Sequence, residues 1–537
     1  MSENSQKKQH KKKRTLSDKS MLVEEIINKQ KQFAKSKPEK KRKQVFDEKR
    51  LLKKARNEEE TLPNSTMAFN NGLESVSTPM KKVDEIKDEP EDFAFVEDSV
   101  EQGKSAFRQV IFPIALDKFM KVHWEKKFLH VKRNDPKYYK HLMSVKSIDQ
   151  MLRENHIQYT RNIDITSYIN GQRVTKNPEG RAKSSEVWDF YEEGCSIRIL
   201  NPQSYIDEVY KMNAQIQEYF HCMTGTNVYL TPPNSQGFAP HYDDIEAFVL
   251  QIEGKKHWRL YNPRCDEEVL PRESSQNFDQ NEIGQPILDV VLEAGDMLYF
   301  PRGIIHQANT VPGCHSLHIT LSVYQKQSYV DFFEYLLTGA LQNAIETDVE
   351  FRKGVPLDFH KHLGVVYSDS KSPRRTELLQ KIRKMFLKMA DELPIDYAAD
   401  QFAKKYQKDA LPPYLTPAEQ TMTYNGSEFE TNEDGGVSFG AEVQLTSEVR
   451  LIKSNIARLV TEDNVIRLYN HIDNSKVYHE FESGFLEIEE EDAGLVETLI
   501  KEYPKFIAVS QLHEDSERAI ALTQDLFDIG LLMKKTL

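Results

Sequence analysis

The chain has 537 residues, which is too long for one hydrophobic core and predicts about two to four domains. With 39% hydrophobic and 29% charged residues, its composition is that of an ordinary soluble protein that carries some disordered sequence. No run approaches ~18 consecutive apolar residues, so we expect no membrane span and no membrane partner. The 4 cysteines form no CxxC pair, which argues against a disulfide framework or a structural zinc knot.

Residues 1–104 form a predicted disordered tail that is first basic and then acidic. Residues 1–56 contain roughly 20 Lys and Arg, although the whole chain has a net charge of −12. The stretch that follows is acidic, including Glu58–Glu60 and the segment Asp84–Asp98. Charge blocks of this kind are typical of disordered tails that meet charged partners. We expect the basic clusters to act as a nuclear or nucleolar address or as an RNA contact; a merely solubilising tail is the alternative.

The sequence predicts a β-rich domain at residues 105–325. Short runs of β-branched and aromatic residues alternate with turn signals, and such spacing predicts a β-sandwich or barrel. The predicted strands are Val228–Thr231, Ala247–Ile252, His257–Tyr261 and Met297–Phe300. The segment 107–220 looks more helical, with Ile148–Leu152 and Tyr205–Phe220 as candidate helices.

Two further units follow along the chain. Residues 326–417 carry amphipathic helices at 329–345 and 374–390, which suit a packing layer or a dimer interface. Residues 418–537 mix predicted strands and helices in a pattern compatible with a winged-helix module. The strands are Val465–Tyr469 and Val477–Phe481, and the helices are Leu495–Glu502 and Ala519–Met533.

The strongest chemical signal is an HxD motif formed by His241 and Asp243. In an extended strand, residues i and i+2 point to the same face, roughly 6.6 Å apart along the chain. The segment Phe300–His306, some sixty residues later, follows a strand-like run with a bend and then supplies a third histidine. We therefore predict that His241, Asp243 and His306 meet at one metal ion.

Two histidines and one carboxylate leave three coordination positions open, which is the facial triad of non-haem Fe(II) oxygenases. The open positions can take 2-oxoglutarate as a bidentate keto acid, and then O2. A structural zinc site would instead close its shell with four protein ligands. The alternative interpretation is a turn histidine beside a surface acid, which leaves the strand context and the third histidine unexplained. The pattern thus predicts a catalytic iron site.

A keto acid also needs an anchor for its distal carboxylate. Lys255 and Lys256 follow an expected turn at Gly254, and alternation on the returning strand directs one of the two lysines inward. An ordinary exposed pair at a hairpin is the alternative. Other polar side chains could complete the pocket: Thr320, Ser322, Asn227 and Tyr229. For His257, His315 and His318 we expect structural roles, although His318 could line the cavity without binding metal.

These segments resemble the JmjC ribosomal oxygenases, most of all the nucleolar subgroup with lysine demethylase and histidyl hydroxylase activities. The likeness covers about residues 105–537. It is carried in the core by Tyr229–Gly237, Pro240–Gln251, Leu298–Gly303 and His306–Ala308, and beyond it by Ser368–Lys371, Arg374, Arg375 and Leu411–Pro413.

The resemblance implies a multidomain α+β protein. Its parts would be a double-stranded β-helix JmjC core, a helical dimerisation domain that makes a homo-oligomer, and a C-terminal winged helix. It also implies Fe(II)- and 2-oxoglutarate-dependent hydroxylation of a histidine in a large-subunit ribosomal protein, with histone H3 lysine demethylation as a second activity. Carried over by motif, the iron ligands are His241, Asp243 and His306, and Lys256 binds the co-substrate with Asn227 and Ser322 as neighbours; Thr320 is a further expected co-substrate contact from its place on the strand after His306. Arg198 and Tyr229 would contact the substrate.

A rival hypothesis is a non-catalytic nucleolar assembly factor that uses the β-domain as a peptide-binding module. Formation of succinate in the presence of iron and 2-oxoglutarate, lost in His241→Ala, would separate the two. The acidic run Glu487–Asp492 in the third unit argues against phosphate contact there.

Overall fold

The computed structural model describes residues 75–77, 95–427, 429–431, 437–439, 442–478, 480 and 482–535. Most of the predicted tail therefore lies outside the described residues. Its last part is helical, because helix α3 (Ser99–Ile111) begins behind Asp98, whose carboxylate accepts hydrogen bonds from the amides of Val100 and Glu101. Helix α3 therefore crosses the domain boundary predicted at residue 104. The sequence placed that boundary too late because Asp98 and Glu101, at the start of the helix, continue the acidic composition of the preceding segment.

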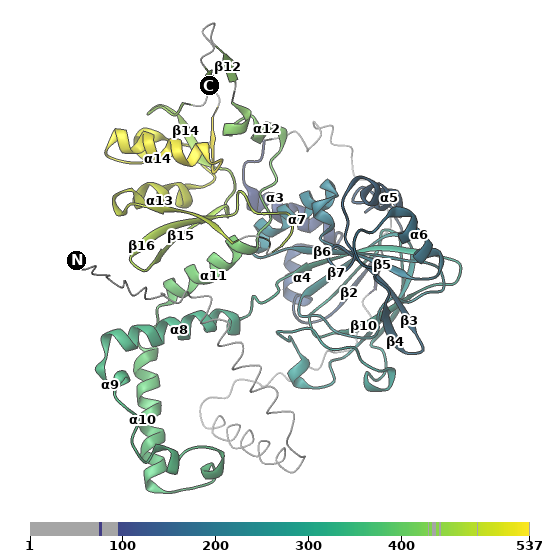
Figure 1. The fold of residues 1–537 in the computed structure, drawn as a ribbon, viewed down its shortest axis with the longest axis horizontal. Helices are drawn as coiled ribbons and strands as arrows, with labels where there is room; N and C mark the ends of the chain where they lie inside the picture. Colours follow the sequence, from purple (N-terminus) through teal and green to yellow (C-terminus); the bar gives the residue numbers. More distant parts are fainter. Residues whose placement is uncertain are drawn as a thin grey trace, which may run out of the picture. The chain divides into compact units, whose positions relative to one another are not determined.

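One large sheet forms the core of the region between residues 129 and 323, and the short strand β1 from residues 75–77 joins its edge (Figure 1). Its strand order is β1-β2-β9-β7-β11-β6-β5-β3-β4, and β8 and β10 also pair with β7. The strands are β1 (Ser75–Ser77), β2 (Leu129–Lys132), β3 (Ile163–Ile169), β4 (Gln172–Thr175), β5 (Ser196–Leu200), β6 (Gly225–Thr231), β7 (Glu246–Tyr261), β8 (Leu288–Glu293), β9 (Met297–Phe300), β10 (Ile305–Thr310) and β11 (Ser316–Val323). This is the cupin-like core that the sequence predicts.

Strand β7 corrects one detail of that prediction. The sequence suggests two strands joined by a turn at Gly254, but β7 runs unbroken through this position. Its first half pairs with β9 and β11, and its second half pairs with β8 and β10. Gly254 bends the strand with a φ of +66°, and a Cβ there would lie 1.9 Å from the carbonyl oxygen of His315. Gly254, which has the sequence character of a turn, is thus the point where β7 leaves its pairing with β9 and β11 and begins its pairing with β8 and β10.

Helices cover the sheet and share a hydrophobic core with it. They are α3, α4 (Leu116–Val122), α5 (Val145–Glu154), α6 (Ser184–Glu192) and α7 (Asp207–Phe220). The buried ring of Phe107 in α3 packs edge-on against Phe220 of α7 and Phe248 of β7, at centroid distances of 4.8 and 5.4 Å. The two predicted helices of this segment are confirmed as α5 and α7. The same segment also contributes β2, β3, β4 and β5, so it is less helical than the sequence suggested.

A helical region follows the sheet. It contains α8 (Tyr329–Thr347), α9 (Val349–Arg352), α10 (Pro373–Ala390) and α11 (Ile395–Asp409), so both predicted amphipathic helices are confirmed. Several apolar side chains on α8 and α10 remain exposed in the single chain, including Phe333 at 45%, Leu341 at 49% and Phe386 at 54%. These helices therefore present an apolar face that the described part of the chain leaves uncovered.

The C-terminal region has its own hydrophobic core, built around residues such as Leu451, Leu495 and Phe527. Its elements are α12 (Pro417–Gln420), β12 (Phe429–Thr431), β13 (Val437–Phe439), β14 (Glu448–Leu451), β15 (Ala457–Glu462), β16 (Val465–Asn470), β17 (Gly484–Ile488), α13 (Ala493–Glu502), β18 (Ile507–Ala508), α14 (Ser516–Asp528) and β19 (Leu532–Lys534). Strands β15, β16 and β17 form one antiparallel sheet, and β14, β18 and β19 form another.

Two predicted elements of this region are wrong. The strand expected at Val477–Phe481 does not form among its described residues, and the next strand of the sheet after β16 is β17, further along the chain. The helix expected to reach Met533 ends at Asp528, because Gly530 with a φ of +83° breaks it and the next residues form β19. Among the described residues, no helix combines the length and the apolarity needed to cross a membrane.

Candidate metal centre

His241 and Asp243 lie in an extended segment between β6 and β7, outside any regular strand. A single antiparallel bridge joins this segment to the start of β10: the amide of His306 donates to the carbonyl of His241 at 2.8 Å, and the amide of His241 donates back at 3.3 Å. The amide of Gly303 donates to the carbonyl of Asp243 at 3.1 Å. The strand expected here is reduced to a single β-bridge between His241 and His306. The segment is nevertheless extended, so the side chains of His241 and Asp243 still point to the same side.

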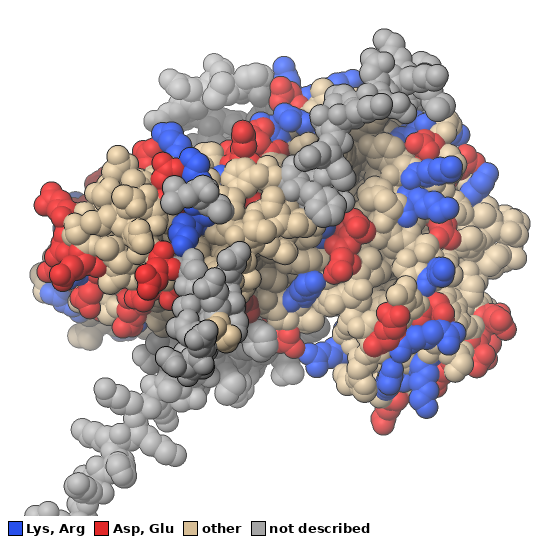
Figure 2. Space-filling view, turned by 90° about the horizontal axis from the view of Figure 1, so that it is seen from above, with Lys and Arg blue, Asp and Glu red and all other residues tan. Residues whose placement is uncertain are grey.

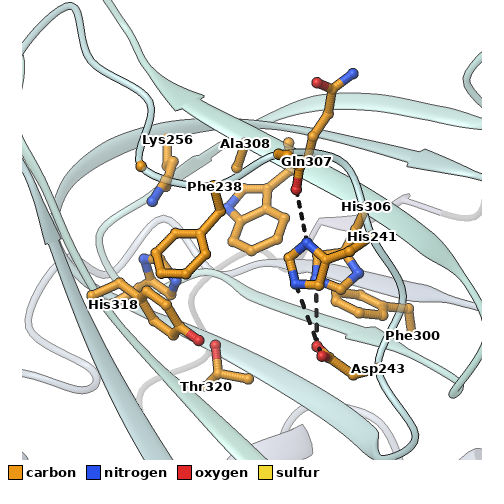
Figure 3. Close-up of a pocket in the computed structure, with 14 residues that line it drawn as sticks. Phe238, His241, Asp243, Lys256, Phe300, His306, Gln307, Ala308, His318 and Thr320 are labelled. Atoms are coloured by element: carbon orange, nitrogen blue, oxygen red, sulfur yellow. Dashed lines mark hydrogen bonds and ion pairs between the residues drawn. The ribbon is translucent and has the colours of Figure 1, made fainter. Parts of the chain in front are cut away.

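The three predicted ligands meet in space (Figure 3). His241 Nε2 lies 3.9 Å from Asp243 Oδ1, and His306 Nε2 lies 3.6 Å from Asp243 Oδ2. One donor atom from each residue falls within 4.8 Å of the others, and among the described residues no fourth His, Cys, Asp or Glu joins the group. Three donors on one side with no fourth ligand match an open catalytic metal site rather than a closed structural one.

Both histidines are prepared for metal binding by the same backbone contact. The Nδ1–H of His241 donates to the carbonyl of Ala239 at 2.8 Å, and the Nδ1–H of His306 donates to the carbonyl of Ile304 at 3.2 Å. A carbonyl can only accept, so Nδ1 carries the proton in each ring and the lone pair remains on Nε2. Burial, helped by the neighbouring His241, lowers the pKa of His306 to about 4. A neutral imidazole is the form that binds metal, so the residues present fit Fe(II).

Lys256 lines the same cavity across from the triad (Figure 3). The residue is 5% exposed, and its ammonium group donates to Thr231 Oγ1 at 3.1 Å and pairs with no carboxylate among the described residues. Burial lowers the pKa of Lys256 to about 7. A buried cation without an anionic partner, facing a metal site, is what a dicarboxylate ligand requires. Alternation along β7 does place Lys256 inward while Lys255 pairs with Glu293 at the surface.

The other predicted site residues divide between two adjoining cavities. Tyr229 and Thr320 border both the Lys256 cavity and a second cleft of about 410 Å³ that opens beside the triad. Asn227, Ser322 and Arg198 line only the second cleft. Arg198 forms an ion pair with Asp164 and lies with its guanidinium carbon 5.6 Å from the ring centre of Phe238. The structure thus brings the six predicted residues that are not metal ligands around the triad, in two neighbouring spaces.

Sequence reasoning missed the side chains that wall the cavity. Phe238 lies between the two spaces, and Trp258 and Phe300 flank His306, at ring distances of 6.1 and 4.7 Å. The buried His318, expected to be structural, does line the cavity and stacks on Tyr229 at 4.9 Å. Alternation along the strand could have indicated Trp258, two positions after Lys256, but no local signal marked Phe238, which lies in a loop.

A cupin-like sheet that carries two histidines and one aspartate with free ligand atoms is the arrangement of a non-haem Fe(II) oxygenase. A model of the JmjC domain matches residues 198–331, and a model of the ribosomal oxygenase 1 C-terminal winged helix domain matches residues 411–536. The chain belongs to the ribosomal oxygenase 1 family, because relatives of that family align with most of its length.

Two relatives illustrate the likeness. The bifunctional lysine-specific demethylase and histidyl-hydroxylase NO66 of Culex quinquefasciatus is 54% identical over 439 residues, which is 82% of this chain and 67% of that protein. Ribosomal oxygenase 1 of Danio rerio is 45% identical over 442 residues, or 82% of this chain and 81% of that protein. Among solved structures, Escherichia coli YcfD is 14% identical with a TM-score of 0.42, covering 79% of this chain and 98% of that one. The family assignment rests on the sequence relatives.

Proposed function

We propose that this chain is an Fe(II)- and 2-oxoglutarate-dependent oxygenase that hydroxylates a histidine of a large-subunit ribosomal protein. Demethylation of a histone H3 lysine is its second candidate activity. The observation that carries the proposal is the convergence of His241, Asp243 and His306, with no fourth His, Cys, Asp or Glu beside them among the described residues, opposite a buried Lys256 that pairs with no carboxylate there. The names of the relatives, which include histidyl hydroxylase, lysine demethylase and ribosomal oxygenase, support the choice of substrate.

Each residue of the centre has a separate task. His241, Asp243 and His306 would hold the ferrous ion, which together with 2-oxoglutarate and O2 supplies the oxidation that hydroxylates an unactivated C–H bond. Lys256 would hold the distal carboxylate of 2-oxoglutarate, because its ammonium is the cation that faces the triad across the cavity. Phe238 and Trp258 keep this space narrow and apolar, which limits the entry of water.

The second cleft is the proposed place for the substrate. It reaches the triad at His241 and Asp243, and its size falls in the range of ligand-binding pockets. Arg198 and Tyr229 line the cleft and are the proposed substrate contacts, while Asn227 and Ser322 lie where either substrate or co-substrate could reach them. The choice between a histidine side chain and a methylated lysine therefore depends on this cleft rather than on the metal.

Mass spectrometry of peptide products tests the proposal directly. The enzyme is incubated with Fe(II), 2-oxoglutarate and either histidine-containing fragments of large-subunit ribosomal proteins or methylated histone H3 peptides. A gain of one oxygen on histidine identifies the hydroxylase, and loss of a methyl group from lysine identifies the demethylase. His241→Ala is the negative control. If the wild-type protein forms no succinate with any peptide, the rival role as a peptide-binding module is favoured.

We also propose that the chain forms a homo-oligomer through the helical region. The side chains exposed on one face of α8 are apolar, at Val330, Phe333, Leu337, Leu341 and Ile345. Such a face is stable in water only when another surface covers it. A second copy of the chain is the proposed cover, since α10 carries a similar exposed face that includes Ile382 and Phe386.

The charged segments suggest location and partners. The basic clusters in residues 1–56 support a nuclear and nucleolar address, with RNA contact as a further proposed role. Imaging of tagged full-length and tail-deleted chains would test the address.

The winged helix offers less support for binding of nucleic acid, because Glu487 and Glu491 are exposed acidic side chains on it. Figure 2 shows acidic side chains gathered toward one end of the visible face.

A further inference from the structure

Residues 240–244 carry the metal ligands His241 and Asp243, and we call them the ligand segment. Residues 271–278, in the loop between β7 and β8, run alongside it, and we call them the strap. The strap forms hydrogen bonds with every second residue of the ligand segment. The amide of Ser275 donates to the carbonyl of Tyr242 at 2.9 Å, and the amide of Tyr242 donates to Ser275 Oγ at 2.8 Å. The remaining contacts are Phe278 N to the Pro240 carbonyl at 2.8 Å, Asp244 N to Ser274 Oγ at 3.3 Å and Ser274 Oγ to Asp244 Oδ1 at 2.7 Å.

The residues between these positions carry the metal ligands. His241 and Asp243 make their backbone contacts on the opposite side, with His306 and Gly303. The ligand segment is therefore held from two sides, by β10 and its preceding turn on one side and by the strap on the other. Since the segment has only one bridge to β10, the strap supplies a large share of the bonds that fix its path.

The strap is tied to the first turn of α8 by Arg272. Its Nε and Nη2 donate to Asp331 Oδ1 at 3.0 and 2.7 Å, and its Nη1 lies 2.9 Å from Glu334 Oε1. The Asp331 side chain is only 7% exposed and also accepts from the amide of Ser328 at 2.9 Å, so the carboxylate is fixed in place. A second link runs directly to the ligand segment: the side-chain amide Nε2 of Gln325, just before α8, donates to Asp244 Oδ2 at 2.9 Å.

We propose that Arg272 is a positioning residue for the metal centre. It transmits the position of α8 through the strap to the ligands His241 and Asp243. The physical reason is that a segment outside any regular sheet is restricted in conformation only where hydrogen bonds or ion pairs anchor it. Arg272 provides that anchor through a charge-assisted fork, and metal affinity depends on ligand placement. The inference rests on the proposed metal site and assigns part of its geometry to a residue that touches neither metal nor substrate.

Binding of Co2+ alone, followed by its visible absorption and by calorimetry, tests this without any substrate. Arg272→Ala should weaken Co2+ binding by about tenfold, the lower end of the range for residues that support metal ligands. Arg272→Lys keeps the charge but loses the fork, and should fall between wild type and Arg272→Ala. Ser275→Ala removes one strap bond on Tyr242 and should weaken binding in the same direction.

The matched control is Arg374→Ala. Arg374 makes a similar two-bond fork to Asp358, at 2.7 and 2.8 Å, within the helical region and away from the strap. This variant should bind Co2+ like the wild type. Equal affinities for wild type, Arg272→Ala and Ser275→Ala would overturn the inference, as would an equal loss in Arg374→Ala. A wild-type protein that binds no Co2+ would overturn the proposed metal site as well, so the two failures are distinguishable.

Discussion

Arg302 and Glu246 form a buried ion pair, with Arg302 Nη1 2.9 Å from Glu246 Oε1, that joins the two chain segments carrying the metal ligands. Glu246 stands three residues after Asp243, and Arg302 stands four residues before His306. The hydroxyl of Tyr299 also donates to Glu246 at 2.5 Å. Burial raises the pKa of Glu246 to about 7, and the Tyr299 hydrogen bond and the charge of Arg302 oppose the rise. This pair thus holds the segment that follows Asp243 against the segment that precedes His306.

Replacing Glu246 with Ala should destabilise the fold by about 3 kcal/mol, because a buried charge loses its partner. The value is at the low end of the expected range since Glu125 also lies 2.6 Å from Arg302. Thermal unfolding measures the change. Glu125→Ala is the control and should cost at most about 1 kcal/mol, because the Glu125 side chain is 31% exposed. Equal losses in the two variants would contradict a special role for Glu246.

Binding of 2-oxoglutarate should weaken as the pH rises above about 7. In the protein without 2-oxoglutarate, burial lowers the pKa of Lys256 to about 7. Above that pH Lys256 loses the positive charge that the distal carboxylate needs. The dissociation constant should rise by up to about tenfold per pH unit until the pKa of the complex is reached. Titration calorimetry at several pH values measures it.

Lys256→Arg provides the control for this pH effect. A guanidinium stays charged throughout this range, so the variant should bind with an affinity that is independent of pH above 7, even if weaker overall. The lowered pKa of His306 places its titration well below this range. A wild-type affinity that does not change with pH would rule out Lys256 as the titrating anchor.

Gly254→Ala should destabilise the protein by about 2–4 kcal/mol, because the residue combines a positive φ with a backbone clash. A Cβ at Gly254 would approach the carbonyl oxygen of His315 to 1.9 Å. Gly284→Ala is the matched control, since Gly284 has a φ of +73° but no heavy atom within 4 Å of the added Cβ. It should cost about 1 kcal/mol, from backbone strain alone. Similar unfolding temperatures for the two variants would show that the bend in β7 tolerates a side chain.

Leu341→Glu should disrupt the proposed oligomer. Leu341 is 49% exposed at the centre of the apolar face of α8, and a carboxylate there cannot be buried against a second copy without a large desolvation cost. Light scattering after gel filtration should show the wild type as a dimer or larger and the variant as a single chain. Val291→Glu, at a 37% exposed position on β8, should leave the mass of the oligomer unchanged. An unchanged mass for Leu341→Glu would place the interface elsewhere.

Much of the centre followed from residue type and spacing alone. One histidine and one aspartate in an HxD motif, together with a distant second histidine, identify a metal site, because few other arrangements use these residues together. Alternation along a strand predicted that one of Lys255 and Lys256 points inward, the family resemblance named Lys256, and the structure buries Lys256 while Lys255 pairs with Glu293. The amphipathic period likewise identified α8 and α10, because helix periodicity is a local property of the sequence.

The tertiary structure decided what depends on partners distant in sequence. Gly254 has the sequence character of a turn, and only the pairing of β7 with four other strands makes it a bend within one strand. Glu246 and Arg302 are far apart in the chain, and so are Arg272 and Asp331; neither pair has a local signal. Sequence therefore determined which side chains can bind the metal, whereas contacts between separate segments decided how they are held, because such contacts exist only after the chain has folded.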